Sequence, residues 1–226
     1  MRLSASLHAA DPLHLAQAAA AVAPHVASLH VDVMDGRFAP AFGFGERLVE
    51  YLLAGDTAPV DVHLMVEEPE AWAVRFAALG ARRVAFHAEA TRDVRGAAGG
   101  IRAVGSLAYL ALLPQTPIAA VADLLSGVDG VLLLTAPPGG GVFDPAALAR
   151  VHQLPPGLSA IVDGHLELAH FKTLRAAGVD LAVIGRALFD GDGLAARAQA
   201  FDRAASSDGA ATQLAPRRTS TSSGMA

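Results

Sequence analysis

The chain has 226 residues, of which 53% are hydrophobic and 17% charged, and it carries a net charge of −5 and no cysteine. This composition supplies a large apolar core, while the missing cysteines exclude disulfides, thiolate metal sites and a cysteine nucleophile. The sequence contains no lysine or arginine block of the kind that binds nucleic acid and no apolar run near the ~18 residues of a membrane span, so we expect a cytoplasmic protein with neither partner.

Strand and helix signals alternate along most of the chain. Short apolar runs predict strands at residues 3–8, 27–34, 60–65, 83–87, 107–112, 130–135, 159–162 and 181–184. Helical patterns cover residues 11–22, 46–53, 68–80, 93–104, 117–126, a segment that starts at 144, 167–177 and 187–204. Two helices begin with an Asp-Pro pair, Asp11-Pro12 and Asp144-Pro145, in which aspartate is the cap and proline takes the first helical position.

Eight strand–helix pairs predict an α/β fold, a closed (β/α)8 TIM barrel that occupies residues 1–204 as a single domain. Length alone also allows two small domains, and an open doubly wound sheet is the competing architecture. A closed barrel is favoured because it brings the ends of the second, third and seventh strands to one point. Residues 205–226 are rich in Ser, Thr, Ala and Gly without an apolar period, and we expect a disordered tail there.

Polar side chains interrupt the apolar strands in a pattern that indicates a metal site. Along residues 29–38, His30, Asp32 and Met34 share one strand face. Burying a carboxylate and an imidazole costs free energy unless an opposite charge neutralises them, and a bound metal ion supplies that charge. His63 shares a face with Met65 on the next strand, and Asp163 ends another strand before a glycine. If these strands are parallel in one barrel, His30, Asp32, His63 and Asp163 converge.

Four motifs resemble the ribulose-phosphate 3-epimerase family over residues 4–202. They read His-Val-Asp-Val-Met-Asp-Gly-Arg-Phe, Asp-Val-His-Leu-Met-Val-Glu-Glu-Pro-Glu, Phe-His-Ala-Glu-Ala-Thr and Val-Asp-Gly, in the family's order and spacing. The resemblance implies a barrel of the ribulose-phosphate-binding type. It also implies a metal-dependent epimerase that inverts C3 of a ketose phosphate, D-ribulose 5-phosphate to D-xylulose 5-phosphate, by two-aspartate proton transfer through an enediolate.

The resemblance assigns roles residue by residue. Asp32 and Asp163 are implied as catalytic acid and base, and His30, Asp32, His63 and Asp163 as ligands of one divalent ion. Two imidazoles and two carboxylates suit Zn²⁺, Fe²⁺, Mn²⁺ or Co²⁺. The implied substrate-binding residues are Ser6, Met34, His63, Met65, Gly139, Gly140, Gly141, Gly164, Gly185 and Arg186. The implied partner is a small sugar phosphate, and the family's habit of assembling allows a homo-oligomer.

The sequence departs from the family around the expected phosphate site. The loop that usually reads Pro-Gly-Phe-Gly-Gly is shorter here and contains Pro137 to Gly141, His165 replaces a glycine, and Arg186 replaces a serine. A histidine can block a backbone phosphate cradle, whereas an arginine can offer a bidentate fork to a phosphate or a carboxylate. Two alternatives follow: an epimerase-like paralogue for a different sugar phosphate or related ligand, and a non-catalytic ligand-binding homologue.

Several of these residues can also be interpreted as purely structural. We expect Asp35 to form a turn with Gly36 and Asp61 to face the helix layer, both in structural roles. His87 either borders the site or is structural. Met34 and Met65 can be core filler, Gly139–Gly141 a plain flexible loop, and Arg186 a surface residue at a helix start. A metal-independent decarboxylase is disfavoured, because the third strand lacks the Asp-x-Lys-x-x-Asp pattern of those barrels.

Overall fold

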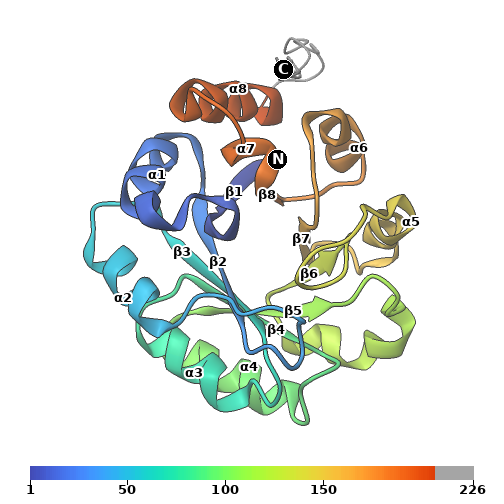
Figure 1. The fold of residues 1–226 in the computed structure, drawn as a ribbon. Helices are drawn as coiled ribbons and strands as arrows, with labels where there is room; N and C mark the ends of the chain where they lie inside the picture. Colours follow the sequence, from blue (N-terminus) through green and yellow to red (C-terminus); the bar gives the residue numbers. More distant parts are fainter. Residues whose placement is uncertain (207–226) are drawn as a thin grey trace, which may run out of the picture.

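The computed structural model describes residues 1–206 and shows a closed barrel of eight parallel strands in chain order, surrounded by helices (Figure 1). The strands are β1 (Arg2–Ser6), β2 (Ser28–Met34), β3 (Val60–Met65), β4 (Arg83–His87), β5 (Leu107–Leu112), β6 (Gly130–Leu134), β7 (Ser159–Asp163) and β8 (Leu181–Ile184). The ring closes where β1 pairs with β8, with Ala5 opposite Ile184. The predicted (β/α)8 barrel is confirmed.

The α-helices form the outer layer. They are α1 (Leu15–Val22), α2 (Glu46–Ala54), α3 (Glu70–Ala78), α4 (Val94–Ala103), α5 (Pro145–Leu148), α6 (Phe171–Ala176), α7 (Arg186–Phe189) and α8 (Leu194–Ser206). No helix in residues 1–206 combines the length and the apolar character that crossing a bilayer requires.

Several predicted helices differ in kind or extent. The segment predicted as a helix at 117–126 is a 3₁₀ helix over Ile118–Gly127, and Asp11 caps a 3₁₀ turn over Pro12–His14 before α1 begins. The single helix predicted at 187–204 is two, because Gly191 and Gly193 adopt positive φ angles of 93° and 72° between α7 and α8. α8 continues to Ser206, and the rest of the predicted tail, 207–226, lies outside the described residues.

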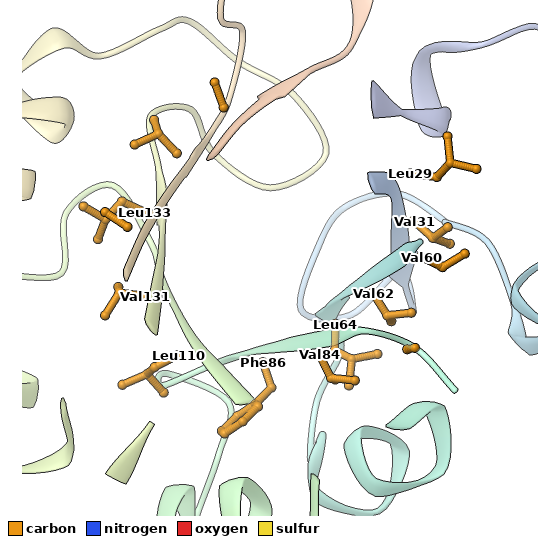
Figure 2. Packing of buried hydrophobic residues seen from close by; sticks show 14 of the residues in the cluster. Leu29, Val31, Val60, Val62, Leu64, Val84, Phe86, Leu110, Val131 and Leu133 are labelled. Atoms are coloured by element: carbon orange, nitrogen blue, oxygen red, sulfur yellow. The ribbon is translucent and has the colours of Figure 1, made fainter. Parts of the chain in front are cut away.

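Two apolar layers hold the barrel. Side chains that alternate along the strands pack outward against the helices; Leu29, Val31, Val60, Val62, Leu64, Val84, Phe86, Leu110, Val131 and Leu133 are shown in Figure 2. A second cluster of Ala85, Tyr109, Ala111, Leu132, Leu134, Ile161, Leu181 and Val183 contains the opposite positions of the strands. This interior is close-packed, so polar groups in the barrel need partners within it.

Asp61 lies inside the barrel, and the prediction that it faces the helix layer is wrong. The β2–β3 register pairs His30 with Asp61 and Asp32 with His63, so Asp61 shares the interior face of the metal-site residues. Its carboxylate is buried and lies 2.7 Å from the guanidinium of Arg83, which in turn lies over the ring of Tyr109. The strand period of two dictates this face, and Arg83 supplies the charge that makes burial of Asp61 tolerable.

Candidate metal centre and substrate cavity

A cavity of about 1000 Å³ opens at the carboxyl ends of the barrel strands. Its wall includes Ser6, Asp32, Met34, Met65, Gly139, Gly140, Gly141, Asp163, Gly164, Gly185 and Arg186, which brings together the expected substrate-binding residues except His63. His63 has no exposed surface and is not part of the wall. Catalytic residues of TIM barrels lie at this end of the strands, so the cavity is the place to look for chemistry.

Four side chains from three strands meet at the floor of the cavity. His30 and Asp32 come from β2, His63 from β3 and Asp163 from β7, and one ligand atom of each lies within 4.8 Å of all the others. Nε2 of His30 lies 3.2 Å from Asp32 Oδ1 and 3.6 Å from Asp163 Oδ2. Nδ1 of His63 lies 3.3 Å and 3.7 Å from the same two oxygens. The predicted convergence is therefore present.

The two histidine nitrogens in this cluster are buried and lack hydrogen-bond partners. Both Nε2 of His30 and Nδ1 of His63 face the carboxylates without the geometry of a hydrogen bond. Bonds of about 2.1 Å to a tetrahedral ion place the ligand atoms about 3.4 Å apart. The four distances between the histidine nitrogens and the carboxylate oxygens, 3.2 to 3.7 Å, agree with that spacing, so these residues fit a single divalent cation.

The two imidazoles and the two carboxylates of the cluster shift one another's pKa values. Burial lowers the pKa of His30, but the carboxylates of Asp32 and Asp163 together with Asp61 raise it to about 9. Burial likewise opposes the charge of His63, and the same two carboxylates raise its pKa. The pKa of Asp32 is well below its usual range because His30 and His63 outweigh the cost of burial. A bound cation would replace the two imidazole protons in neutralising the carboxylates.

Neighbouring residues hold the cluster in place. The hydroxyl of Ser6 donates to Oδ2 of Asp32 at 2.9 Å, which leaves Oδ1 to face the histidines. Asp35 accepts backbone N–H bonds from Arg37, Phe38 and Glu67, so it ties the loop after β2 to the loop after β3. The turn role predicted for Asp35 is confirmed.

His87 contacts a proposed metal ligand directly. Its Nε2 lies 3.0 Å from Nε2 of His63, and its Nδ1 lies 3.2 Å from a carboxylate oxygen of Glu89. Burial lowers the pKa of His87 to about 4, with Glu89 opposing that shift. Burial raises the pKa of Glu89, but hydrogen bonds from His87, Thr116 and Leu113 dominate and lower it to about 2. Of the two readings the sequence leaves open, a place beside the site is therefore correct.

The residues that depart from the family pattern meet at the opposite wall. His165 has a φ of 53°, a backbone region that glycine occupies readily and other residues rarely. One terminal nitrogen of Arg186 lies 2.6 Å from Nδ1 and 2.9 Å from Nε2 of His165. At Gly164, with φ 123°, a Cβ would lie 2.6 Å from the backbone nitrogen of Ala136, so only glycine allows this approach of the β6 and β7 loops.

Apolar and loop residues complete the wall. Met34 and Met65 pack with Ala39 in a small cluster that Phe38 and Ala41 cover. A Cβ on Gly139 would lie within 3.5 Å of Pro40 and Ala41, which shows that the loop after β6 reaches the loop after β2 across the mouth of the cavity. Met34 and Met65 therefore both pack and line the cavity.

Sequence reasoning missed several residues of this end of the barrel. Glu167 and Asp190 line the cavity from positions outside the helices and strands, where no periodicity predicts a side chain's direction. Glu89 stands two residues after His87, and this i, i+2 spacing on a strand end was the available signal. No sequence pattern predicts that the guanidinium of Arg150 is buried and donates to carbonyls at the ends of β5 and β6.

Comparison with known proteins agrees with this geometry. A family model described as the ribulose-phosphate 3 epimerase family matches residues 2–189. The chain belongs to the ribulose-phosphate 3-epimerase family. The ribulose-phosphate 3-epimerase of Mycobacterium tuberculosis is 38% identical over 212 residues, which cover 90% of this chain and 92% of that protein. Ribulose-phosphate 3-epimerase 1 of Cupriavidus necator is 34% identical over 210 residues, with 85% and 87% covered.

Membership of this family makes the protein an isomerase of the racemase and epimerase class, and the family acts on sugar phosphates. Solved structures share the fold at lower identity. KGPDC from Streptococcus mutans superposes with a TM-score of 0.72 at 17% identity, covering 90% of this chain and 96% of that one. 3-Hexulose-6-phosphate synthase from Salmonella typhimurium gives 0.71 at 16% identity, covering 91% and 98%.

Proposed function

We propose that this epimerase interconverts D-ribulose 5-phosphate and D-xylulose 5-phosphate, with Asp32 and Asp163 as the acid and base and one divalent cation as cofactor. The observation that carries the proposal is the arrangement of two carboxylates around two orphaned histidine nitrogens at the floor of a large cavity. Zn²⁺, Fe²⁺, Mn²⁺ and Co²⁺ all suit this ligand set.

The two aspartates are placed to act on a substrate from two sides. Asp32 lies near the carboxyl end of β2 and Asp163 ends β7, with β8 and β1 between them around the barrel. Both line the cavity, whereas the histidines lie beneath its surface. One carboxylate accepts the C3 proton, the other returns a proton to the opposite face, and the configuration inverts because the two faces differ.

The remaining residues prepare this transfer. When bound, the cation supplies Lewis-acid stabilisation of the negative charge that develops on the enediolate oxygens. His30 and His63 would hold the cation with neutral nitrogens, Ser6 orients Asp32, and Met34 and Met65 present apolar surface to the reacting carbons.

The substrate phosphate belongs at the opposite wall. Gly164 and Gly185 permit close approach of the backbone, and Arg186 adds a guanidinium that can bind two phosphate oxygens. The loop Gly139–Gly141 faces the same space. His165 replaces a glycine whose backbone contacts the phosphate in the family, and the guanidinium of Arg186 supplies a charged contact in its place.

A second candidate function rests on the His165–Arg186 contact. This pair narrows the wall that would receive the phosphate, and a ligand with a differently placed anion would engage Arg186 equally well. The candidate is an epimerase for another ketose phosphate that keeps the same cation and aspartates. Location in the cytoplasm and assembly into a homo-oligomer stay predictions from the sequence.

Solvent deuterium exchange tests the proposal. Ribulose 5-phosphate incubated in D2O with cation-loaded protein should gain deuterium at C3, and Asp163→Asn should lose that exchange while it retains the cation. Exchange into other ketose phosphates only would transfer support to the second candidate. No exchange into any ketose phosphate would contradict both and leave a ligand-binding homologue.

A further inference from the structure

A chain of hydrogen bonds leads from His63 away from the cavity toward the protein surface. Nδ1 of His63 faces Asp32 and Asp163, and Nε2 faces Nε2 of His87 at 3.0 Å. Nδ1 of His87 faces Oε2 of Glu89 at 3.2 Å. The other carboxylate oxygen of Glu89 accepts the backbone N–H of Leu113 at 2.9 Å and the hydroxyl of Thr116.

The carboxylate of Glu89, at the outer end of this chain of hydrogen bonds, determines which nitrogen of each histidine carries a proton. Oε1 of Glu89 accepts from Leu113 and Thr116, and despite burial these bonds keep the pKa of this carboxyl at about 2, so Oε2 is an acceptor as well and Nδ1 of His87 carries the proton toward it. An imidazole that carries one proton, here on Nδ1, presents a lone pair at its other nitrogen, so Nε2 of His87 faces His63 as an acceptor. Two ring nitrogens 3.0 Å apart need one donor, and that donor is Nε2–H of His63.

We propose that His87 and Glu89 are positioning residues that fix His63 with its proton on Nε2, so that the Nδ1 lone pair faces the cation. This inference rests on the proposed function, because it needs the cation site at the floor of the cavity. Outer-shell hydrogen bonds of this kind set the tautomer and ring orientation of histidine ligands in metal proteins. Neither residue touches the substrate cavity.

The outer end of the chain is itself held rigidly. The side chain of Glu89 is 21% exposed, and its partners Leu113 and Thr116 belong to the loop after β5. The carbonyls of those same two residues accept hydrogen bonds from the buried guanidinium of Arg150. On the inner side, the ring of Phe38 packs against His87 with 4.6 Å between centroids. His87 therefore has a fixed orientation to transmit to His63.

A purely structural His87 makes a different prediction from a positioning one. Loss of a core histidine lowers the stability of the metal-free protein and leaves cation affinity alone. Loss of a positioning acceptor leaves Nε2–H of His63 without a partner, so the proton and the ring orientation are no longer fixed. Cation affinity then falls, and the hydrogen bond of His63 Nε2–H is lost.

The test compares His87→Leu and Glu89→Gln with the full-length wild-type chain and with Glu70→Gln as matched control. Glu70 is a carboxylate that accepts the backbone N–H of Arg92 and lies outside the chain to His63. The probe is Zn²⁺ alone, with affinity measured by chelator competition, the hydrogen bond of His63 Nε2–H by nitrogen NMR and stability by unfolding in EDTA. In Glu89→Gln the amide cannot accept from His87, Leu113 and Thr116 together, so the chain is broken without loss of volume.

The expected result is a loss of Zn²⁺ affinity of about 10- to 100-fold in His87→Leu and at least about threefold in Glu89→Gln, with Glu70→Gln unchanged. NMR of the Zn²⁺-loaded protein should show Nε2–H of His63 in a hydrogen bond in the wild type, and that hydrogen bond lost or weakened in both variants. The inference is overturned if both variants bind Zn²⁺ as tightly as the wild type, or if Nε2–H of wild-type His63 forms no hydrogen bond when Zn²⁺ is bound. Should His87→Leu not fold, Glu89→Gln decides by the same criteria.

The failure of this inference is distinguishable from failure of the proposed function. Wild-type protein that binds Zn²⁺ and exchanges the C3 proton, with variants unaffected, overturns the inference alone. Wild-type protein that binds no divalent cation overturns the cation site and this inference with it.

Discussion

Arg186 brings a permanent positive charge to a cavity whose floor contains two carboxylates. Within residues 1–206 it is the only lysine or arginine of the cavity wall, and its side chain contacts His165 rather than an acidic group. An arginine held by a neutral histidine keeps its full charge for a ligand. Charge-assisted hydrogen bonds of this type contribute about 1.5–3 kcal/mol each.

We predict that Arg186→Ala raises the KM for ribulose 5-phosphate about 10- to 100-fold and changes kcat less, because the phosphate lies away from the reacting carbon. Steady-state kinetics on the cation-loaded enzyme measure both constants. Arg102→Ala, which removes an arginine on α4 far from the cavity, is the control and should match the wild type. An unchanged KM in Arg186→Ala would remove Arg186 from substrate binding.

Glu89 is one of the carboxylates that contribute to the stability of the folded protein in acid. Its pKa falls from the usual 4.5 to about 2 in the folded protein, so the folded state binds its proton less readily than the unfolded chain does. The stability it contributes is fully present above about pH 4.5 and is lost as the pH falls toward 2.

Glu89→Gln should therefore show a shallower loss of stability than the wild type between about pH 5 and about pH 3. Urea unfolding midpoints measured in EDTA across this range give the comparison, and EDTA removes any contribution from bound cations. Parallel curves for the two proteins would show that Glu89 has an ordinary pKa in the folded state.

The sequence predicts the four proposed ligands, because the strand period places His30 with Asp32 on one face and His63 on the inward face of the next strand. The same period places Asp61 inside the barrel with His63, and the prediction that Asp61 faces the helix layer is wrong because it does not follow that period. The contact between His165 and Arg186 could not be predicted, because two loops distant in sequence determine it.

At the scale of elements, Arg150 joins the ends of neighbouring strands. It lies in the 3₁₀ helix Ala149–Gln153, and its guanidinium donates to four carbonyls, those of Leu113, Thr116, Leu134 and Ala147. Burial lowers its pKa, and within the described part of the chain no carboxylate pairs with it directly. The contact holds the β5 and β6 loops together beside the cavity.

Arg150→Met should lower the free energy of unfolding by about 2–4 kcal/mol, because four carbonyls lose a charged donor in a region where the arginine is buried. Denaturant unfolding measures the change. Arg95→Met is the matched control, since Arg95 is exposed and donates to a single carbonyl, and its loss should cost no more than about 0.5 kcal/mol. Equal effects of the two substitutions would show that burial of Arg150 adds nothing.

Element types follow the sequence more closely than element ends do. The apolar runs predict all eight strands, but Ile118–Gly127 folds as a 3₁₀ helix although its composition equally suits an α-helix. The division between α7 and α8 follows from Gly191 and Gly193, which a run of helix formers on either side obscures. Local propensity does not distinguish these cases, since packing against the barrel decides them.

For the whole molecule, barrel closure produces the site. The strands β2 and β7 lie far apart in the sequence and contribute carboxylates to one floor only because β1 pairs with β8. The proposed ligands and the cavity wall all lie between Ser6 and Asp190.

A chain that ends at residue 206 should therefore keep the kcat/KM and the melting temperature of the full-length protein. Kinetics and thermal unfolding of the two chains, both cation-loaded, provide the check. A large loss of activity at unchanged stability would assign a catalytic contribution to residues beyond 206.

We propose above that His30, Asp32, His63 and Asp163 bind one divalent cation, with Asp32 and Asp163 also acting as acid and base. Anomalous diffraction at the zinc edge from crystals loaded with Zn²⁺ tests this binding most directly. We expect one strong peak per chain, about 2.0–2.2 Å from a nitrogen or oxygen atom of each of the four side chains. Absence of a peak at the cavity floor, or a peak bound by other residues with Asp32 or Asp163 turned away, would contradict it.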